Sequence, residues 1–493
     1  MTTDAATARV RTQILVVGSG AGGAITALEC ARAGLDVTIV EEGGYHEHRA
    51  GHTEGTAAAM QKLYRRRGMM PILGSVPIGY VEGSCVGGST EINSGFWHRT
   101  PREVLARWQA QFDLDGASSE ELTEHFEAVE SLVGVSLYGR PWPKSSEILA
   151  RGARAMGWAA EEVPRAATRC QSSNACPMGC PTGAKQGMSI SVVPEAQRHG
   201  ARLLTRARVK LLLKTGTRVT GVLIDVEVEP GVRKLVRVDA EHVFVCAGPS
   251  ETPSLLRRTG LKMHIGETLR IHPMLKVVAQ FPEVTGATES VLPLLQVREF
   301  WPEISLGGAF FTPGHAALAL SENWVAERMS DLERMAGYYV AVRGRGRGRV
   351  RPSMIGDDAT KLHYELAEED VTNLSNGLAR LSMLLLAAGA TEVYPSVQGL
   401  APIRSEKQAI RWLDERLARE ALGLSTVHAF SSCPIGERLD RCAADSYGKI
   451  YGMENLYVND ASMLPDSPGV NPQGSVMAFA RRNATRFINH LTH

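Results

Sequence analysis

The chain has little of what would tie it to a nucleic acid, a membrane or a disulfide framework. Its 54 Lys and Arg residues balance 53 Asp and Glu residues, so the sequence offers no basic surface to a polyanion. No apolar run approaches the roughly 20 residues that span a bilayer. Eight cysteines among 493 residues are too few for a disulfide-stapled protein. We therefore expect no nucleic acid partner and no membrane span.

The amino-terminal segment also lacks the features of an export signal. Residues 1–12 contain no apolar core of a signal peptide, and Arg9 and Arg11 do not form a twin-arginine pair. We expect a cytoplasmic protein. With 44% hydrophobic content the chain can bury a large core, and we expect two interlocked lobes.

What the chain does have is a strand, a glycine-rich turn and a helix near its start. Residues 14–17 predict a buried strand, residues 24–32 a helix closed by Gly34, and residues 37–40 a second buried strand. Continuous apolar strands are typical of a parallel sheet that is covered on both faces. The order strand, helix, strand predicts an α/β fold with a Rossmann-like unit.

The turn after the first strand has the glycine spacing of a dinucleotide-binding loop. Gly18 permits the tight turn, Gly20 lets the backbone approach a pyrophosphate, and Gly23 lets helix and strand pack closely. The amino terminus of the helix then faces the phosphates. Glu41 ends the second strand, where its carboxylate can accept hydrogen bonds from ribose hydroxyls. On these residues alone, FAD and NAD are both open.

The rest of the chain predicts further strands and one long helix. Residues 203–247 alternate in strand fashion. An amphipathic helix follows later, with Asp370 suited to its cap and Gly389 to its end. The arginine and glycine run at 343–349 predicts a solvated strand face in preference to an RNA-binding tract.

Distant motifs resemble the signatures of the glucose-methanol-choline (GMC) oxidoreductases. Residues 83–101, which begin Gly-Ser-Cys-Val-Gly-Gly-Ser-Thr-Glu-Ile-Asn, are similar to the first signature, and residues 248–260 to the second. Residues 459–472 resemble the closing FAD motif. The stretches 179–186 and 269–273 are of the kind seen in long-chain alcohol oxidases and cholesterol oxidases. The sequence therefore resembles this family, nearest to those two branches.

The resemblance implies FAD as the cofactor and the GMC fold. In that fold an FAD-binding Rossmann-like domain is interlocked with a substrate-binding domain built on an antiparallel sheet with helices. We assign the FAD-binding domain to residues 10–275 and 428–493, with a cysteine-containing insertion near 165–190, and the substrate-binding domain to 276–427. By motif position, the resemblance adds these cofactor-binding residues to the four named above: Gly87, Gly88, Asn93, Val209, Asp460, Ala461 and Pro472.

The same resemblance implies the reaction. A primary or secondary alcohol is oxidised to an aldehyde or ketone by hydride transfer to flavin N5, and the electrons pass to an external acceptor. The hydroxyl proton needs a base, and an imidazole suits neutral pH. His428 aligns with the family's catalytic histidine, although Ala429 and Ser431 depart from the usual loop. Asn471 aligns with the second catalytic residue and can hydrogen-bond the substrate oxygen. His272 is assigned a structural role.

A helix expected from Gly474 to Ile488 would aim its amino terminus at the flavin and stabilise negative charge there. Two other functions stay open: an alcohol oxidase that uses oxygen, and a flavin-dependent lyase on the same fold. Aliphatic alcohols, sterols and sugars are all open as substrates, because periodicity does not reveal the lining of a pocket.

Three cysteines form a cluster of their own. Cys170, Cys176 and Cys180 have the spacing of a bacterial ferredoxin motif in which Ser173 replaces the second cysteine. Three thiolates suit a [3Fe-4S] iron–sulfur cluster, which would relay electrons to a protein acceptor, and some GMC sugar dehydrogenases carry one. The alternative is a set of buried thiols without metal.

Overall fold

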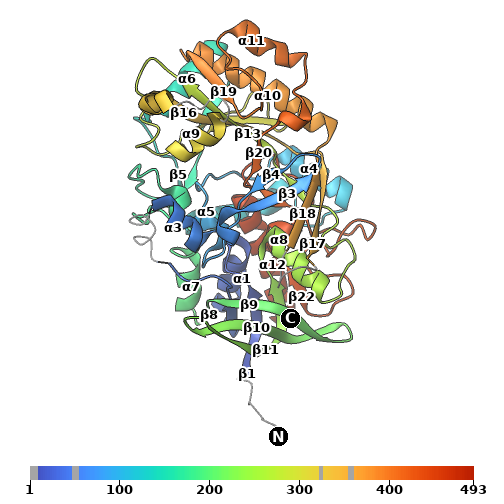
Figure 1. Cartoon of the computed structure of the whole chain (residues 1–493). Helices are drawn as coiled ribbons and strands as arrows, with labels where there is room; N and C mark the ends of the chain where they lie inside the picture. The colour runs from blue at the N-terminus through green and yellow to red at the C-terminus, as the bar shows by residue number, and fades with distance from the viewer. Residues whose placement is uncertain (1–8, 47–54, 321–325, 354–359, 493) are drawn as a thin grey trace.

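The computed structural model describes residues 9–46, 55–320, 326–353 and 360–492. These residues build two large sheets, and each sheet has its own hydrophobic core. The two sheets occupy different halves of the molecule, with β9, β10 and β11 at one end and β13, β16 and β19 toward the other (Figure 1). This mixed α/β architecture confirms the predicted fold class.

The first sheet has seven strands and contains the predicted βαβ unit. Its order is β8-β2-β1-β11-β10-β9, and β22 adds to β11. The pairs β8/β2, β2/β1, β1/β11 and β11/β22 are parallel, whereas β10 pairs antiparallel with both β11 and β9. The strands are β1 (Arg9–Val17), β2 (Val37–Val40), β8 (Arg202–Leu204), β9 (Ala207–Thr215), β10 (Arg218–Glu229), β11 (Val232–Val245) and β22 (Leu456–Val458).

Helices cover this sheet. Helix α1 (Ala21–Arg32) begins directly after the glycine turn and packs against α12 and α7, while α12 also packs against α5. Gly34 follows α1 with φ 79°, a left-handed conformation that favours glycine and ends the helix. The helices on this half are α4 (Arg102–Phe112), α5 (Ser119–Leu132), α7 (Val192–Arg198), α8 (Gly248–Arg258) and α12 (Gln473–Thr492).

The second sheet has eleven strands and is mostly antiparallel. Its order is β17-β18-β3-β4-β20-β13-β16-β15-β14-β6, with β19 added to β13. The strands are β3 (Met70–Gly74), β4 (Ile78–Tyr80), β6 (Ala160–Glu162), β13 (Met274–Gln280), β14 (Leu295–Val297), β15 (Ile304–Gly308), β16 (Met335–Val342), β17 (Arg347–Pro352), β18 (Thr360–Glu365), β19 (Glu392–Pro395) and β20 (Leu424–Thr426).

The long predicted helix packs on this sheet. Helix α10 (Glu368–Ala387) lies against β15, β16 and α6 (Lys144–Met156), and Gly389 follows its end with φ 95°. Asp370 is not the cap residue, because the helix begins two residues before it. Its carboxylate instead accepts hydrogen bonds from the backbone N–H of Ala367 (3.0 Å) and of Arg345 (2.7 Å).

The remaining elements are short. They are α3 (Gly55–Leu63), α9 (Pro313–Leu320), α11 (Glu406–Ile410), β5 (Val135–Ser136), β7 (Arg165–Ala166), β12 (Arg270–Ile271), β21 (Ala429–Phe430), η1 (Arg65–Gly68), η2 (Gly88–Glu91), η3 (Cys176–Met178), η5 (Ala326–Arg334), η6 (Arg411–Leu413), η7 (Arg419–Ala421) and η8 (Ala461–Met463). In the ranges that the structure describes, no helix has the length and apolarity needed to cross a membrane.

Two features differ from the sequence expectation. Strands β3, β4 and β6 join the second sheet, although they come from the chain segment that we assigned to the FAD-binding domain. The arginine run is also not uniform. Arg347 and Arg349 are exposed on the edge strand β17, as expected, but Arg343 is buried and reaches Asp466 (3.3 Å) and Glu303 (3.5 Å). A guanidinium that leaves water needs such carboxylate partners.

Candidate active site

A cavity of about 860 Å³ joins the two halves of the protein. At one end it is lined by the Gly18 turn and β9 of the first sheet, and at the other by β13 and β16 of the second sheet. His428 and Asn471 lie on the same cavity. A single space therefore connects the predicted dinucleotide loop with both predicted catalytic residues.

The glycine loop has the close packing that a dinucleotide site requires. A Cβ atom on Gly18 would lie 2.3 Å from the Cys246 carbonyl oxygen, and one on Gly23 would lie 2.0 Å from the Gly18 carbonyl oxygen. Gly20 differs, because nothing lies within 4 Å of its Cβ position and the residue lines the cavity. Gly18 and Gly23 thus permit the turn, while Gly20 leaves open space where a pyrophosphate fits.

Glu41 is held rigidly beside this turn. Its Oε2 accepts hydrogen bonds from the backbone N–H (3.0 Å) and the hydroxyl (2.8 Å) of Ser19, and its Oε1 accepts one from the Gly43 N–H (2.9 Å). The Ser19 hydroxyl also accepts a bond from the Gly87 N–H (3.0 Å). Burial, and then the neighbouring charge of Glu42, raises the pKa of Glu41. The carboxylate lines the cavity at the end of β2, as predicted.

The other predicted cofactor residues divide into two groups. Gly23 and Gly87 do not line the cavity, and each instead lies where a side chain would collide with neighbouring atoms; a Cβ on Gly87 would lie 2.2 Å from the Glu91 side chain. The residues that do line the cavity, in addition to Gly18, Gly20 and Glu41, are Gly88, Asn93, Val209, Asp460, Ala461 and Pro472. These residues come from distant parts of the chain and fit an extended dinucleotide such as FAD.

Asp460 and Asn93 have hydrogen bonds that fix this part of the cavity. Asp460 accepts bonds from the Gly248 N–H (2.8 Å) and the Thr252 hydroxyl (2.5 Å), which ties it to the start of α8. Burial raises the pKa of its carboxyl. The Asn93 amide donates to the Gln473 side chain (2.6 Å). Gln473 is the first residue of α12, so the predicted helix does begin at the cavity.

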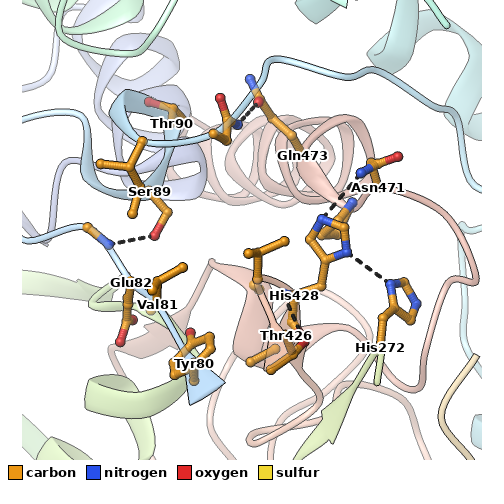
Figure 2. Close-up of a pocket in the computed structure, with 18 of the residues that line it drawn as sticks. Tyr80, Val81, Glu82, Ser89, Thr90, His272, Thr426, His428, Asn471 and Gln473 are labelled. Carbon is orange, nitrogen blue, oxygen red and sulfur yellow. Dashed lines mark hydrogen bonds between the residues drawn. The ribbon is translucent and has the colours of Figure 1, made fainter. Parts of the chain in front are cut away.

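The predicted catalytic pair is in contact. Asn471 Nδ2 lies 3.3 Å from His428 Nε2, and Figure 2 shows the two side chains facing each other. Gln296, on β14, fixes the orientation of Asn471, because its Nε2 lies 3.2 Å from Asn471 Oδ1. The same Gln296 amide lies 2.5 Å from the Tyr339 hydroxyl. Asn471 therefore presents its N–H group, and not its carbonyl oxygen, to the histidine.

His272 lies on the other side of His428. Their Nδ1 atoms are 3.1 Å apart (Figure 2). His272 Nε2 is 2.8 Å from the Ser467 hydroxyl. Since Asn471 donates to Nε2 of His428, the proton of the neutral imidazole is on Nδ1 and points to His272. Burial, and then the charge of Lys276, lowers the pKa of His428 to about 4. At neutral pH His428 is thus an uncharged base whose lone pair lies on Nε2, where it accepts the hydrogen bond from Asn471.

Backbone pairing places the two histidines together. Strand β12 pairs antiparallel with β21, with Ile271 opposite Ala429, so the residues that flank this pair, His272 and His428, are neighbours. The Thr426 hydroxyl, at the end of β20, donates to the His428 carbonyl oxygen (2.9 Å). His272, to which the sequence assigned a structural role, therefore lies directly against the predicted base. Sequence reasoning missed Gln296 and Tyr339, which belong to no recognisable motif.

The cysteine cluster does not form an assembled metal site. Within the described ranges, no group of three or more His, Cys, Asp or Glu side chains is arranged to hold a metal ion. Arg165 donates to the Sγ atoms of Cys176 (3.2 Å) and Cys170 (3.6 Å), and the Lys185 N–H donates to Cys180 Sγ (3.3 Å). These donors occupy the thiols, so the structure gives the iron–sulfur hypothesis no support.

Comparison with known proteins identifies the family. Two models described as GMC oxidoreductase match residues 60–274 and 344–480, and a model described as FAD binding domain matches residues 13–67. The chain belongs to the GMC oxidoreductase family. It is 39% identical to the uncharacterised GMC-type oxidoreductase y4nJ of Sinorhizobium fredii, over 97% of this chain and 94% of that protein.

Two further similarities mark the range of the family. The chain is 28% identical to the long-chain-alcohol oxidase FAO3 of Arabidopsis thaliana, over 98% of this chain and 69% of that protein. Its fold is similar to a crystal structure of pyridoxine 4-oxidase from "Mesorbium loti", with a TM-score of 0.73 and 18% identity, over 98% of this chain and 100% of the other. The chain is thus an FAD-dependent GMC oxidoreductase, and alcohol-oxidising enzymes are among its relatives.

Proposed function

We propose that this GMC oxidoreductase oxidises a primary or secondary alcohol to an aldehyde or ketone and passes the electrons to an external acceptor. The observation that carries the proposal is the contact of Asn471 with His428 on the cavity that the Gly18 loop also lines. Bound FAD supplies the hydride acceptor, N5 of the flavin. The residues of the chain supply the base, the orientation of the alcohol and a site from which water is excluded.

The hydrogen bonds define what each residue does. An alcohol that enters between the pair receives a hydrogen bond from Asn471 Nδ2 and donates its hydroxyl proton to His428 Nε2. His428 can accept this proton because burial keeps its imidazole neutral, with a pKa of about 4. The contact of its Nδ1 with His272, at 3.1 Å, holds the proton on the far nitrogen and the lone pair toward the alcohol.

Reduction of the holoenzyme by an alcohol under anaerobic conditions tests the function. We expect primary alcohols to bleach the visible flavin absorbance and a His428→Ala variant with full FAD content to be slower by about 10²- to 10⁴-fold. His363→Ala is the matched control, because His363 is exposed on β18 and contacts Glu365. Equal rates in His428→Ala and wild type would contradict the proposal.

The relatives support an alcohol as the substrate but leave the acceptor open. One relative is named for the oxidation of long-chain alcohols. An oxygen-using oxidase is the second candidate, and comparing peroxide formation with the reduction of an artificial electron acceptor separates the two. A non-redox lyase would leave the flavin oxidised in the anaerobic experiment. Iron and acid-labile sulfide analysis of anaerobically prepared protein tests separately whether Cys170, Cys176 and Cys180 hold a cluster.

A further inference from the structure

The cavity is lined by a half-buried cation that the oxidation of a plain alcohol does not use. Lys276 lies on β13 and lines the cavity together with His428 and Asn471. The backbone places it firmly: Lys276 is opposite Tyr339 on β16, and its carbonyl oxygen accepts a hydrogen bond from the Ser396 N–H (2.9 Å). The backbone at Lys276 is therefore fixed within a central strand of the second sheet.

The charge of Lys276 has no opposite charge beside it. Throughout the described ranges, no hydrogen bond or ion pair from its Nζ is found, whereas the buried Arg343 reaches two carboxylates. The nearest compensation is the ring of Tyr339, whose centroid is 5.8 Å from Nζ, a distance at which a cation–π contact is weak. Burial alone lowers the pKa of Lys276, to about 8, so the ammonium form still dominates at neutral pH.

A ligand that fills the cavity covers this half-buried ammonium group, and a cation that loses its water without an anionic partner is costly, so its position points to an anion that arrives with the ligand. The cavity walls include apolar residues such as Phe311 and, on either side of Lys276 along β13, Met274 and Val278. An ammonium group among such residues suits a ligand that has an apolar body and one negative end. The charge is also close enough to the base to lower the pKa of His428.

We propose that Lys276 binds an anionic group of the substrate, in the first place a carboxylate, while the carbinol carbon lies at His428 and Asn471. The preferred substrates are then hydroxy acids, with an apolar chain between the alcohol and the acid. This inference rests on the proposed function, because it assigns a binding residue to the other end of the same substrate.

Matched substrate pairs test the inference on the holoenzyme. Rates of anaerobic flavin reduction are measured with ω-hydroxy acids of four to ten carbons and with the 1-alkanols of equal length. Since a hydrogen bond to a charged group discriminates more strongly than a neutral one, we expect the best acid to exceed its alkanol in kcat/KM by about 10- to 100-fold. A preference below about threefold at every length would overturn the inference.

Variants of Lys276 assign the preference to this residue. Lys276→Met also removes a charge that lowers the pKa of His428, so the readout is the ratio of kcat/KM for an acid to that for the alkanol of equal length. This ratio should fall to about one in Lys276→Met, mainly through a raised KM for the acids, whereas Lys276→Arg should keep most of it. Lys361→Met, an exposed lysine on β18 of the same sheet, is the control and should behave as wild type. Equal losses for acids and alkanols in Lys276→Met would show a role other than anion binding and would overturn the inference.

A binding experiment separates failure of this inference from failure of the proposed function. Hexanoate and hexanamide are titrated into wild type and Lys276→Met, and the change in the flavin spectrum reports binding without any turnover. Binding of hexanoate that is at least tenfold tighter than that of hexanamide, and that is lost in Lys276→Met, supports the anion site even if no alcohol reduces the flavin. No difference between the two ligands would contradict the anion site even if alcohols are oxidised.

Discussion

Replacement of His272 by leucine should slow flavin reduction without weakening the binding of the alcohol. His272 Nδ1 lies 3.1 Å from His428 Nδ1 and is the acceptor that keeps the His428 proton on that nitrogen. Without it, a buried N–H group loses its partner at a cost of about 1–3 kcal/mol, and the other tautomer of His428 gains by that amount. That tautomer has no lone pair on Nε2. The rate should therefore fall by about 5- to 150-fold.

His272→Asn is the matched variant. The δ atoms of asparagine occupy nearly the place of the imidazole Nδ1, so the amide oxygen can still accept from His428, while the contact with the Ser467 hydroxyl (2.8 Å) is lost. The assay is anaerobic stopped-flow reduction by a saturating neutral alcohol, with FAD content and melting temperature checked for each protein. We expect kcat to fall strongly in His272→Leu and by less than about tenfold in His272→Asn, with KM nearly unchanged. A wild-type kcat in His272→Leu would refute the orienting role.

Of four further predictions, two concern the base and one each concerns its partner and the cofactor loop. Because burial lowers the pKa of His428 to about 4, kcat/KM for a neutral alcohol should be level from about pH 7 to pH 5 and fall tenfold per pH unit below about 4. The same depressed pKa means that stability is lost as pH falls from 6.5 to about 4, which thermal unfolding over that range measures. Asn471→Ala should lower kcat by about 10- to 100-fold at constant FAD content in the stopped-flow assay, since the alcohol oxygen loses its hydrogen bond. Gly22→Ala should lower the melting temperature of the apoprotein, because a Cβ there would lie 1.9 Å from the Asn459 carbonyl oxygen. Gly20→Ala should leave the melting temperature unchanged, because nothing lies within 4 Å of its Cβ position, and should reduce only the FAD content.

The local elements were predictable because their causes are local. The strand predicted at 14–17 and the helix predicted at 24–32 follow from an apolar run and from the glycines of the turn between them. The structure contains both, within the longer β1 and α1. Residues that pair across the chain were not predictable in this way. Strands β3 and β6 join the second sheet through partners about 290 and 130 residues away, since Ile72 is opposite Leu362 and Leu295 is opposite Glu162. Such pairings depend on topology, and no sequence period records them.

The residues of the site also divide into those that motifs predict and those that depend on the three-dimensional structure. His428 and Asn471 were found through motifs, and the structure places them in contact. Gln296, which orients Asn471, lies on β14, 175 residues away along the chain, and Lys276 belongs to an apolar strand in which one lysine reads as a surface residue. Gln296 and Lys276 could be recognised only in the structure, where the second sheet brings their strands to the cavity. Lys276 is notable because it lines the cavity without an ion pair in the described ranges, and that property has no signature in the sequence.

The two histidines lie where the chain passes between the two halves of the protein. His272 separates β12 from β13, and His428 separates β20 from β21. Strands β13 and β20 pair within the second sheet, while β12 and β21 pair with each other beside it. The two segments in which the chain passes from one half to the other are thus joined by backbone hydrogen bonds on either side of the histidine pair. A small displacement of one half of the protein against the other would therefore move both imidazole rings together. The 3.1 Å contact that sets the tautomer of His428 is kept in such a displacement. Other distances across a cavity between two halves would change more easily.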